Sequence, residues 1–79
     1  MSTAILNQNM PVAGNIRRII KATGLKQCAV AKRIGYSQQE FTDMLCGRRI
    51  IKVSDVTKLC QALNVSIAEL FYEDKEKAV

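Results

Sequence analysis

The side chains in this sequence that could do chemistry are mostly cationic. The chain has twelve Lys and Arg residues against seven Asp and Glu residues, a net charge of +5, and it has no His. Residues 1–52 hold nine of the basic residues and two of the acidic ones, a balance of +7, whereas residues 53–79 have a balance of −2. A concentration of positive charge suits a polyanionic partner, although Lys and Arg side chains also simply solvate helix faces.

A catalytic or metal-binding set of residues is not evident. The absence of His removes the commonest general base and metal ligand, and the chain has neither a Gly-rich phosphate-binding loop nor a cluster of carboxylates. Cys28, Cys46 and Cys60 lie 18 and 14 residues apart, so no pair has the C-x-x-C spacing of redox and zinc motifs. We therefore predict a protein that is not an enzyme, keeps its thiols reduced, and needs no cofactor or metal.

Length and composition indicate one small domain. A chain of 79 residues that is 48% hydrophobic supports one core and no second domain. No apolar run approaches the roughly 18 residues of a membrane span, and no secretory signal is evident, so we expect a cytoplasmic protein. The expected divisions are a loosely ordered segment over 1–10, a domain over 11–72 and a charged tail over 73–79.

Apolar residues at helical spacing predict an all-α domain, a compact bundle of five short helices. The expected helices cover residues 11–23, 27–34, 38–46, 53–63 and 67–71. Glycines end the first three, and Ser-x-x-Glu capping boxes begin at Ser37 and Ser66. The side chains expected to face the core are Val12, Ile16, Ile19, Val30, Ala31, Ile34, Tyr36, Phe41, Met44, Leu45, Val53, Val56, Leu59, Cys60, Leu63, Ile67, Leu70 and Phe71. Ile50 and Ile51 either fill the core or belong to an exposed apolar patch.

The segment from Gln27 to Gly47 has the pattern of a helix-turn-helix, two short helices joined by a tight turn. Helices of this length are not stable alone, so they must pack closely against each other and against the rest of the chain. Ala31 provides the small side chain that a close crossing needs. Gly35 provides the backbone freedom that a sharp turn needs.

Over residues 12–71 the sequence resembles the phage repressor and Cro class of helix-turn-helix proteins, also called XRE-like. The resemblance rests on Leu25-x-Gln27, Ala31, Gly35, Ser37, Phe41, Met44, Gly47-Arg48-Arg49 and the segment from Leu59 to Phe71. It implies a lambda-repressor-like domain that binds double-stranded operator DNA as a transcriptional regulator, with repression favoured. It also implies a homodimer, as is common in that class.

The same resemblance implies that the helix beginning at Gln38 enters the major groove. It places Gln38, Gln39, Thr42 and Asp43 against base edges, where a Gln amide can pair with adenine and Thr42 can touch a thymine methyl or a phosphate. Asp43 can accept a hydrogen bond from cytosine or instead pair with a neighbouring Lys or Arg. Glu40 either closes its capping box or reaches the DNA. The residues implied to contact phosphates are Lys26, Gln27, Arg48, Arg49 and Lys52.

A second class of function remains an alternative: a small protein-interaction module, such as an antitoxin whose main partner is a protein. The two classes predict different surfaces. DNA binding predicts a positive face with Gln38 and Gln39 exposed at its centre. An interaction module predicts a large exposed apolar patch around Ile50, Ile51 or Phe71 and Tyr72.

Overall fold

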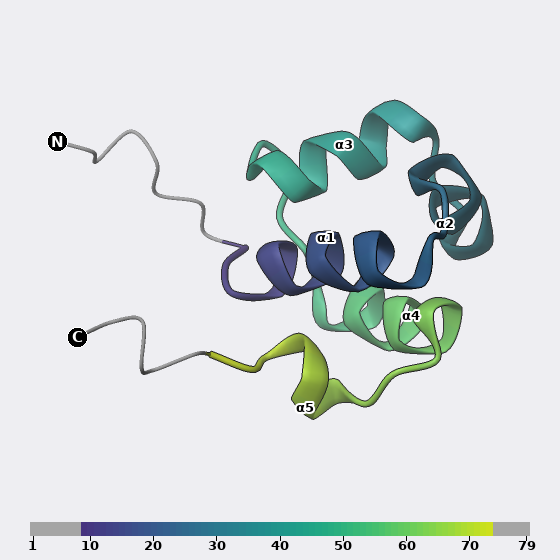
Figure 1. Ribbon diagram of the computed structural model, residues 1–79. Coiled ribbons are helices and arrows are strands. Elements are labelled where there is room, and N and C mark those ends of the chain that lie inside the picture. Colours follow the sequence, from purple (N-terminus) through teal and green to yellow (C-terminus); the bar gives the residue numbers. More distant parts are fainter. Residues whose placement is uncertain (1–8, 74–79) are drawn as a thin grey trace, which may run out of the picture.

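Five short helices, connected by turns, make up the computed structural model, which describes residues 9–73 (Figure 1). The helices are α1 Val12–Thr23, α2 Gln27–Ile34, α3 Gln38–Cys46, α4 Val53–Leu63 and α5 Ile67–Leu70. α1 runs through the middle and packs on α3 and α5, while α4 packs on α2 and α5 (Figure 1). The described part of the chain contains no strand, and the predicted all-α fold with five helices is confirmed.

Each helix boundary has a local cause. α1, α2 and α3 each end at a glycine in the left-handed conformation, and α4 ends at Asn64, whose φ is 58°. Ser37 accepts the N–H of Glu40 at the start of α3, and the Glu40 carboxylate accepts the N–H of Ser37 in return. Ser66 and Glu69 repeat this exchange at the start of α5. Both predicted capping boxes are therefore confirmed.

The core forms where the apolar faces of all five helices meet. Phe41 is the largest of the fully buried side chains, and it comes from α3. The buried apolar side chains are Val12, Ala13, Ile16, Ile19, Val30, Ala31, Ile34, Phe41, Met44, Leu45, Val56, Leu59, Leu63 and Leu70. The predicted inward faces of α1, α2 and α3 are confirmed at every named position.

Three residues predicted to face the core are instead exposed. Val53 is 84% exposed because the buried face of α4 is centred on Asp55 and Leu59, which leaves the first residue of the helix at its edge. Ile67 is 56% and Phe71 is 49% exposed, because α5 is a single turn and buries only Leu70. Cys60, which was also predicted to face the core, is half-buried. Cys28 and Cys46 are exposed.

Asn9 connects the start of the described chain to the end of α3. Its amide Nδ2 donates to the carbonyl oxygens of Met44 at 2.6 Å and Arg49 at 2.7 Å, and its Oδ1 accepts the N–H of Ile51 at 3.0 Å. This buried side chain differs from the expectation that residues 1–10 are loosely ordered, because Asn9 satisfies backbone groups of the α3–α4 loop. Residues 1–8 and the tail over 74–79 lie outside the described residues.

A second buried amide, Asn15 on α1, holds the end of α5. Its Nδ2 donates to the carbonyl oxygens of Leu70 at 2.6 Å and Tyr72 at 2.8 Å. The short α5 is therefore attached to α1 through backbone hydrogen bonds as well as through the buried Leu70.

The helices of residues 9–73 are all too short or too polar to cross a membrane. Within the same residues, His, Cys, Asp and Glu side chains form no group of three that could hold a metal ion.

Candidate nucleic-acid interface

α2 and α3 meet at a tight turn formed by residues 35–37. Gly35 has a φ of 82°, a value that side-chain-bearing residues rarely adopt, although an added Cβ would meet no atom within 4 Å. The N–H of Tyr36 donates to the carbonyl oxygen of Ala31 at 2.9 Å, and the small Ala31 side chain is buried. The turn therefore has the geometry that the sequence predicted for residues 27–47.

The first turn of α3 presents two adjacent amide side chains to solvent. Gln38 and Gln39 are both exposed, directly after the tight turn. The Nε2 of Gln38 donates to the Oε1 of Gln27 at 3.4 Å, so the first residues of α2 and α3 lie together. Thr42 lies one turn further along α3 and is half-buried.

Glu40 has the capping role that we considered for it. Its carboxylate accepts the Ser37 N–H at 2.8 Å, and that bond holds the Glu40 pKa below its ordinary value. The same carboxylate lies 3.7 Å from the guanidinium of Arg49.

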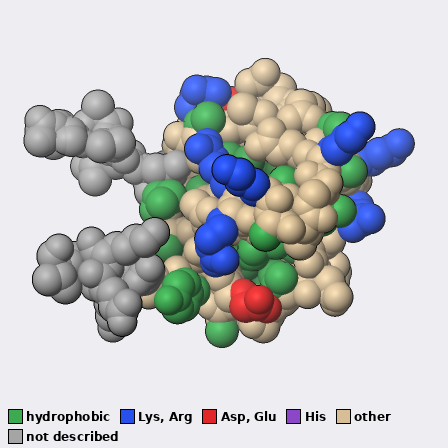
Figure 2. Space-filling view, in the orientation of Figure 1, with side chains coloured by type: hydrophobic (Ala, Val, Ile, Leu, Met, Phe, Trp, Pro, Cys, Tyr) green, Lys and Arg blue, Asp and Glu red, His purple; other side chains and the backbone are tan. Residues whose placement is uncertain are grey.

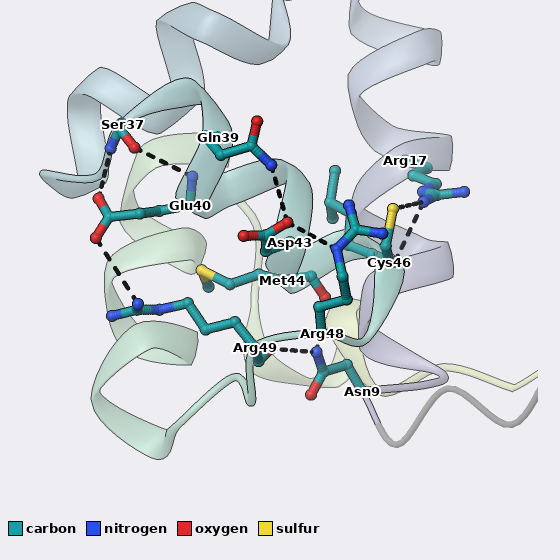
Figure 3. Close-up of polar contacts among 11 residues, drawn as sticks. Asn9, Arg17, Ser37, Gln39, Glu40, Asp43, Met44, Cys46, Arg48 and Arg49 are labelled. Atoms are coloured by element: carbon teal, nitrogen blue, oxygen red, sulfur yellow. Dashed lines mark hydrogen bonds and ion pairs between the residues drawn. The ribbon is translucent and has the colours of Figure 1, made fainter.

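Asp43, on α3, forms an ion pair with Arg48, which follows the helix (Figure 3). Its Oδ1 accepts from the Nε of Arg48 at 2.9 Å and from the Nε2 of Gln39 at 3.0 Å. The bond from Arg48 and the bond from Gln39 lower the Asp43 pKa despite partial desolvation. Of the two alternatives for Asp43, the local ion pair is the one that the structure contains.

The residues predicted to contact phosphates lie at both ends of α3. Lys26 and Gln27 are at the start of α2, which the Gln27–Gln38 contact places beside the first turn of α3. Arg48, Arg49 and Lys52 are exposed in the loop between α3 and α4.

Figure 2 shows Lys and Arg side chains in two groups on one face of the molecule. One group lies over the amino-terminal part of α1 and the carboxyl end of α3, and the other lies beside α2 (Figures 1 and 2). Lys26 lies near the first turn of α3, and Arg48 and Arg49 follow its last turn. Positive charge is therefore present near both ends of α3, as an interface with a phosphate backbone requires.

Arg17 is a cationic residue of this surface that was not among the predicted site residues. Its Nη2 donates to the carbonyl oxygen of Leu45 at 3.2 Å and lies 3.7 Å from the Sγ of Cys46 (Figure 3). A guanidinium at the carboxyl end of a helix is favoured by the helix dipole. No local pattern in the sequence connects α1 to the end of α3, so this position could not be recognised from spacing.

Tyr36 connects the turn of the motif to α4. Its hydroxyl donates to Asp55 Oδ1, and the Lys52 N–H donates to Asp55 Oδ2 at 3.0 Å. Arg49 lies over the Tyr36 ring at 5.0 Å from its centroid, and Lys58 lies at 5.9 Å. The turn, the loop and α4 are thus held together at one aromatic ring. The Asp55 cap was not predicted from the sequence, although an acid at the third position of a helix is a signal by which it could have been found.

The Asp55 carboxylate gives the fold a defined dependence on pH. Burial raises its pKa, but the hydrogen bonds from Tyr36 and Lys52 outweigh burial and leave the pKa below its ordinary value. A depressed pKa stabilises the folded state above the unfolded value of about 3.9, and this stabilisation is lost as pH falls through the folded pKa. The pKa of Tyr36 is raised, mainly by its bond to Asp55.

Asp55→Asn is expected to lower the free energy of unfolding by about 1–3 kcal/mol at pH 7, because an amide has a single, uncharged oxygen and the Tyr36 hydroxyl and the Lys52 N–H can no longer each donate to a carboxylate oxygen. Urea denaturation between pH 7 and pH 3 measures the effect, and the difference from the wild type is expected to shrink as the wild-type carboxylate becomes protonated. Glu73→Gln removes an exposed carboxylate and serves as the control. A difference that stays constant down to pH 3 would contradict the role of the Asp55 charge.

α2 and α3 are two short helices joined by a tight turn, and α3 presents polar side chains to solvent with cationic residues near its ends. This arrangement defines a helix-turn-helix domain. The family described as helix-turn-helix domain matches residues 13–70, and the chain belongs to this family.

Individual proteins that resemble this chain are consistent with its membership of the family. Over 59 residues the chain is 41% identical to the uncharacterized HTH-type transcriptional regulator y4dJ of Sinorhizobium fredii (strain NBRC 101917 / NGR234), covering 75% of this chain and 77% of that protein. The restriction-modification controller protein C.AhdI from Aeromonas hydrophila has a similar structure, with a TM-score of 0.74 and 24% identity over 84% of this chain and 100% of that one. The clp gene regulator ClgR from C. glutamicum has a TM-score of 0.70 and 19% identity over 75% of this chain and 77% of that one. The resemblance to the repressor and Cro class is confirmed.

Proposed function

We propose that this protein is a transcriptional regulator that represses by binding double-stranded operator DNA in a sequence-specific way, with α3 in the major groove. The observation that carries the proposal is the exposed pair Gln38 and Gln39 on the first turn of α3, directly after the tight turn. In helix-turn-helix complexes the amino-terminal residues of the second helix contact base edges. The relative named an HTH-type transcriptional regulator supports the assignment.

The contacts divide into two kinds. Gln38 and Gln39, with Thr42 behind them, contact bases, and a Gln amide in a bidentate pair with adenine gives about 1–3 kcal/mol of discrimination. Lys26, Gln27, Arg48, Arg49 and Lys52 contact phosphates and position α3 without selecting a sequence. Occupying the operator is sufficient for repression because it blocks access to the DNA. The protein acts in the cytoplasm and requires neither catalysis nor a cofactor.

Competition binding tests this function. Labelled genomic fragments are titrated with the protein at two salt concentrations in the presence of nonspecific duplex. We expect some fragments to be bound far more tightly than the competitor, with an affinity that falls steeply with salt because each neutralised phosphate contributes a slope of about −0.9. Equal affinity for every fragment and for the competitor would overturn the function.

A homodimer is the second part of the proposal, and an apolar groove near the carboxyl end of α3 supports it. Met10, Ile50 and Phe71 are exposed and line a groove of about 180 Å³ together with half-buried Ile51. Asn9, which also lines this groove, is bonded to the last turn of α3, at the end opposite to Gln38 (Figure 1).

We assign a second copy of the chain to this groove. One α3 spans only a few base pairs, and a two-fold dimer presents two such helices to half-sites about 34 Å apart. The alternative, a protein-interaction module, predicts an apolar patch at the same residues. A dimer explains both that patch and the polar face of α3, whereas an interaction module explains the patch alone.

Ile50→Asp is expected to shift a dimer to monomer and to weaken operator binding, because it places a charge in the apolar groove. Analytical ultracentrifugation with and without DNA measures the shift. Val53→Asp is the matched control, since Val53 is exposed but does not line the groove. Binding of one wild-type monomer to a single asymmetric site would contradict the dimer.

A further inference from the structure

The carboxylate of Asp43 contacts two residues that have different roles in the proposed function. Its Oδ1 accepts from Gln39 Nε2 at 3.0 Å and from Arg48 Nε at 2.9 Å (Figure 3). Gln39 belongs to the base-contacting turn of α3, and Arg48 belongs to the phosphate-contacting loop. The backbone carbonyl of Asp43 also accepts the N–H of Arg48 at 2.9 Å and that of Arg49 at 3.2 Å. Asp43 therefore fixes both the side chain of Arg48 and the backbone of the two residues that follow Gly47 at the end of α3.

The contact with Asp43 determines which way the Gln39 amide faces. A carboxylate can only accept hydrogen bonds, so the NH₂ end of the amide must face Asp43, and the reversed amide would place two oxygens together. In Figure 3 the amide oxygen of Gln39 points away from Asp43. One N–H of the amide bonds to Asp43, which leaves the other N–H and the oxygen for a ligand. One donor beside one acceptor is the pattern that adenine N7 and N6 require.

The same contact explains how a negative charge is tolerated on this helix. Phosphates repel a free carboxylate, but the Asp43 side chain is 29% exposed and is paired with the guanidinium of Arg48, which is 62% exposed. Both donors are on Oδ1, so a cytosine N4–H would have to bond to Oδ2. Such a contact is not needed to offset the Asp43 charge, because Arg48 already pairs with it.

We propose that Asp43 is a positioning residue, which orients the Gln39 amide for adenine and aligns Arg48 beside the major groove of the DNA, and that it does not itself recognise a base. This inference rests on the proposed function and assigns a base preference to one of its residues. It makes the adenine preference of Gln39 dependent on a residue one turn further along α3.

The test begins with duplexes selected by the wild-type protein from a random-sequence pool. Affinities of the wild type, Gln39→Ala, Asp43→Ala and Gln39→Ala/Asp43→Ala are measured on the selected duplex and on duplexes that carry each single base-pair replacement. Asp43→Ala is expected to reduce the preference for adenine about tenfold at the base pair that Gln39→Ala affects. The double variant is expected to show no further loss, because both changes remove the same contact.

Two further variants separate positioning from charge and from folding. Asp43→Asn keeps an oxygen that can accept from Gln39, so it is expected to retain most of the adenine preference. Glu73→Ala removes an exposed carboxylate beyond α5, and it is expected to raise affinity for all duplexes without changing the preference. Thermal unfolding checks that every variant is folded.

Three results would overturn the inference. If Asp43→Ala changes the preference at a base pair of its own, additively with Gln39→Ala, then Asp43 contacts a base directly. If Asp43→Ala weakens all duplexes equally and keeps the adenine preference, then its role is structural. If the wild type enriches no sequence from the pool, the proposed function itself fails and this inference fails with it.

Discussion

Phe41→Ala is expected to lower the free energy of unfolding by about 3–5 kcal/mol. Phe41 is fully buried on α3, and truncating it leaves a cavity between the helix-turn-helix motif and the rest of the core. A chain of 79 residues holds about 4–12 kcal/mol of stability in total, so this one change removes a large part of it. Urea denaturation followed by circular dichroism measures the loss.

Tyr72→Ala is the control for this experiment. It also truncates an aromatic side chain, at a position that is 57% exposed after α5 and outside the apolar groove. We expect a cost below about 1.5 kcal/mol there, since much of the ring remains in water in the folded state. An equal cost at the two positions would contradict the placement of the core.

Gln38→Ala/Gln39→Ala is expected to remove most of the sequence preference in DNA binding, because both amides of the first turn of α3 are lost. Arg48→Ala/Arg49→Ala is expected to weaken all duplexes about equally. It is also expected to reduce the log–log salt slope by about 2, because two phosphate contacts disappear. Titration of a preferred and a competitor duplex at several salt concentrations separates the two effects.

Controls for these variants come from other helices of the same domain, α4 and α1. Gln61→Ala removes an exposed amide from α4, and Lys21→Ala removes an exposed cation from the last turn of α1. Gln61→Ala is expected to leave the sequence preference unchanged. If the glutamine pair and the arginine pair have the same effect on preference, the division into base and phosphate contacts is wrong.

Local sequence signals predicted most of this fold. Apolar spacing identified the buried faces of α1, α2 and α3, and the Ser37–Glu40 box identified the start of the helix that carries the candidate site. These signals act within one or two helical turns, so they can be recognised without knowing the tertiary structure. They failed at α5, where one turn is too short for periodicity to show that only Leu70 is buried.

The contacts that position the site are mostly long-range, and this explains why they were not predicted. Asn9 bonds to the last turn of α3 and to the α3–α4 loop, 35 to 42 positions away, and Tyr36 bonds to Asp55 at a separation of 19. No periodicity connects such pairs. Asp43 is the intermediate case, because its partners lie four and five positions away and the ion pair was one of two alternatives.

The most direct measurement of base recognition by α3 is selection of bound duplexes from a random-sequence pool, followed by sequencing. We predict an enriched motif of two inverted half-sites whose centres lie about 34 Å apart, as a two-fold dimer with one α3 in each major groove requires. Most of the enrichment is expected to be lost for Gln38→Ala/Gln39→Ala. A wild-type pool that remains as random as the input would contradict sequence-specific recognition by this helix.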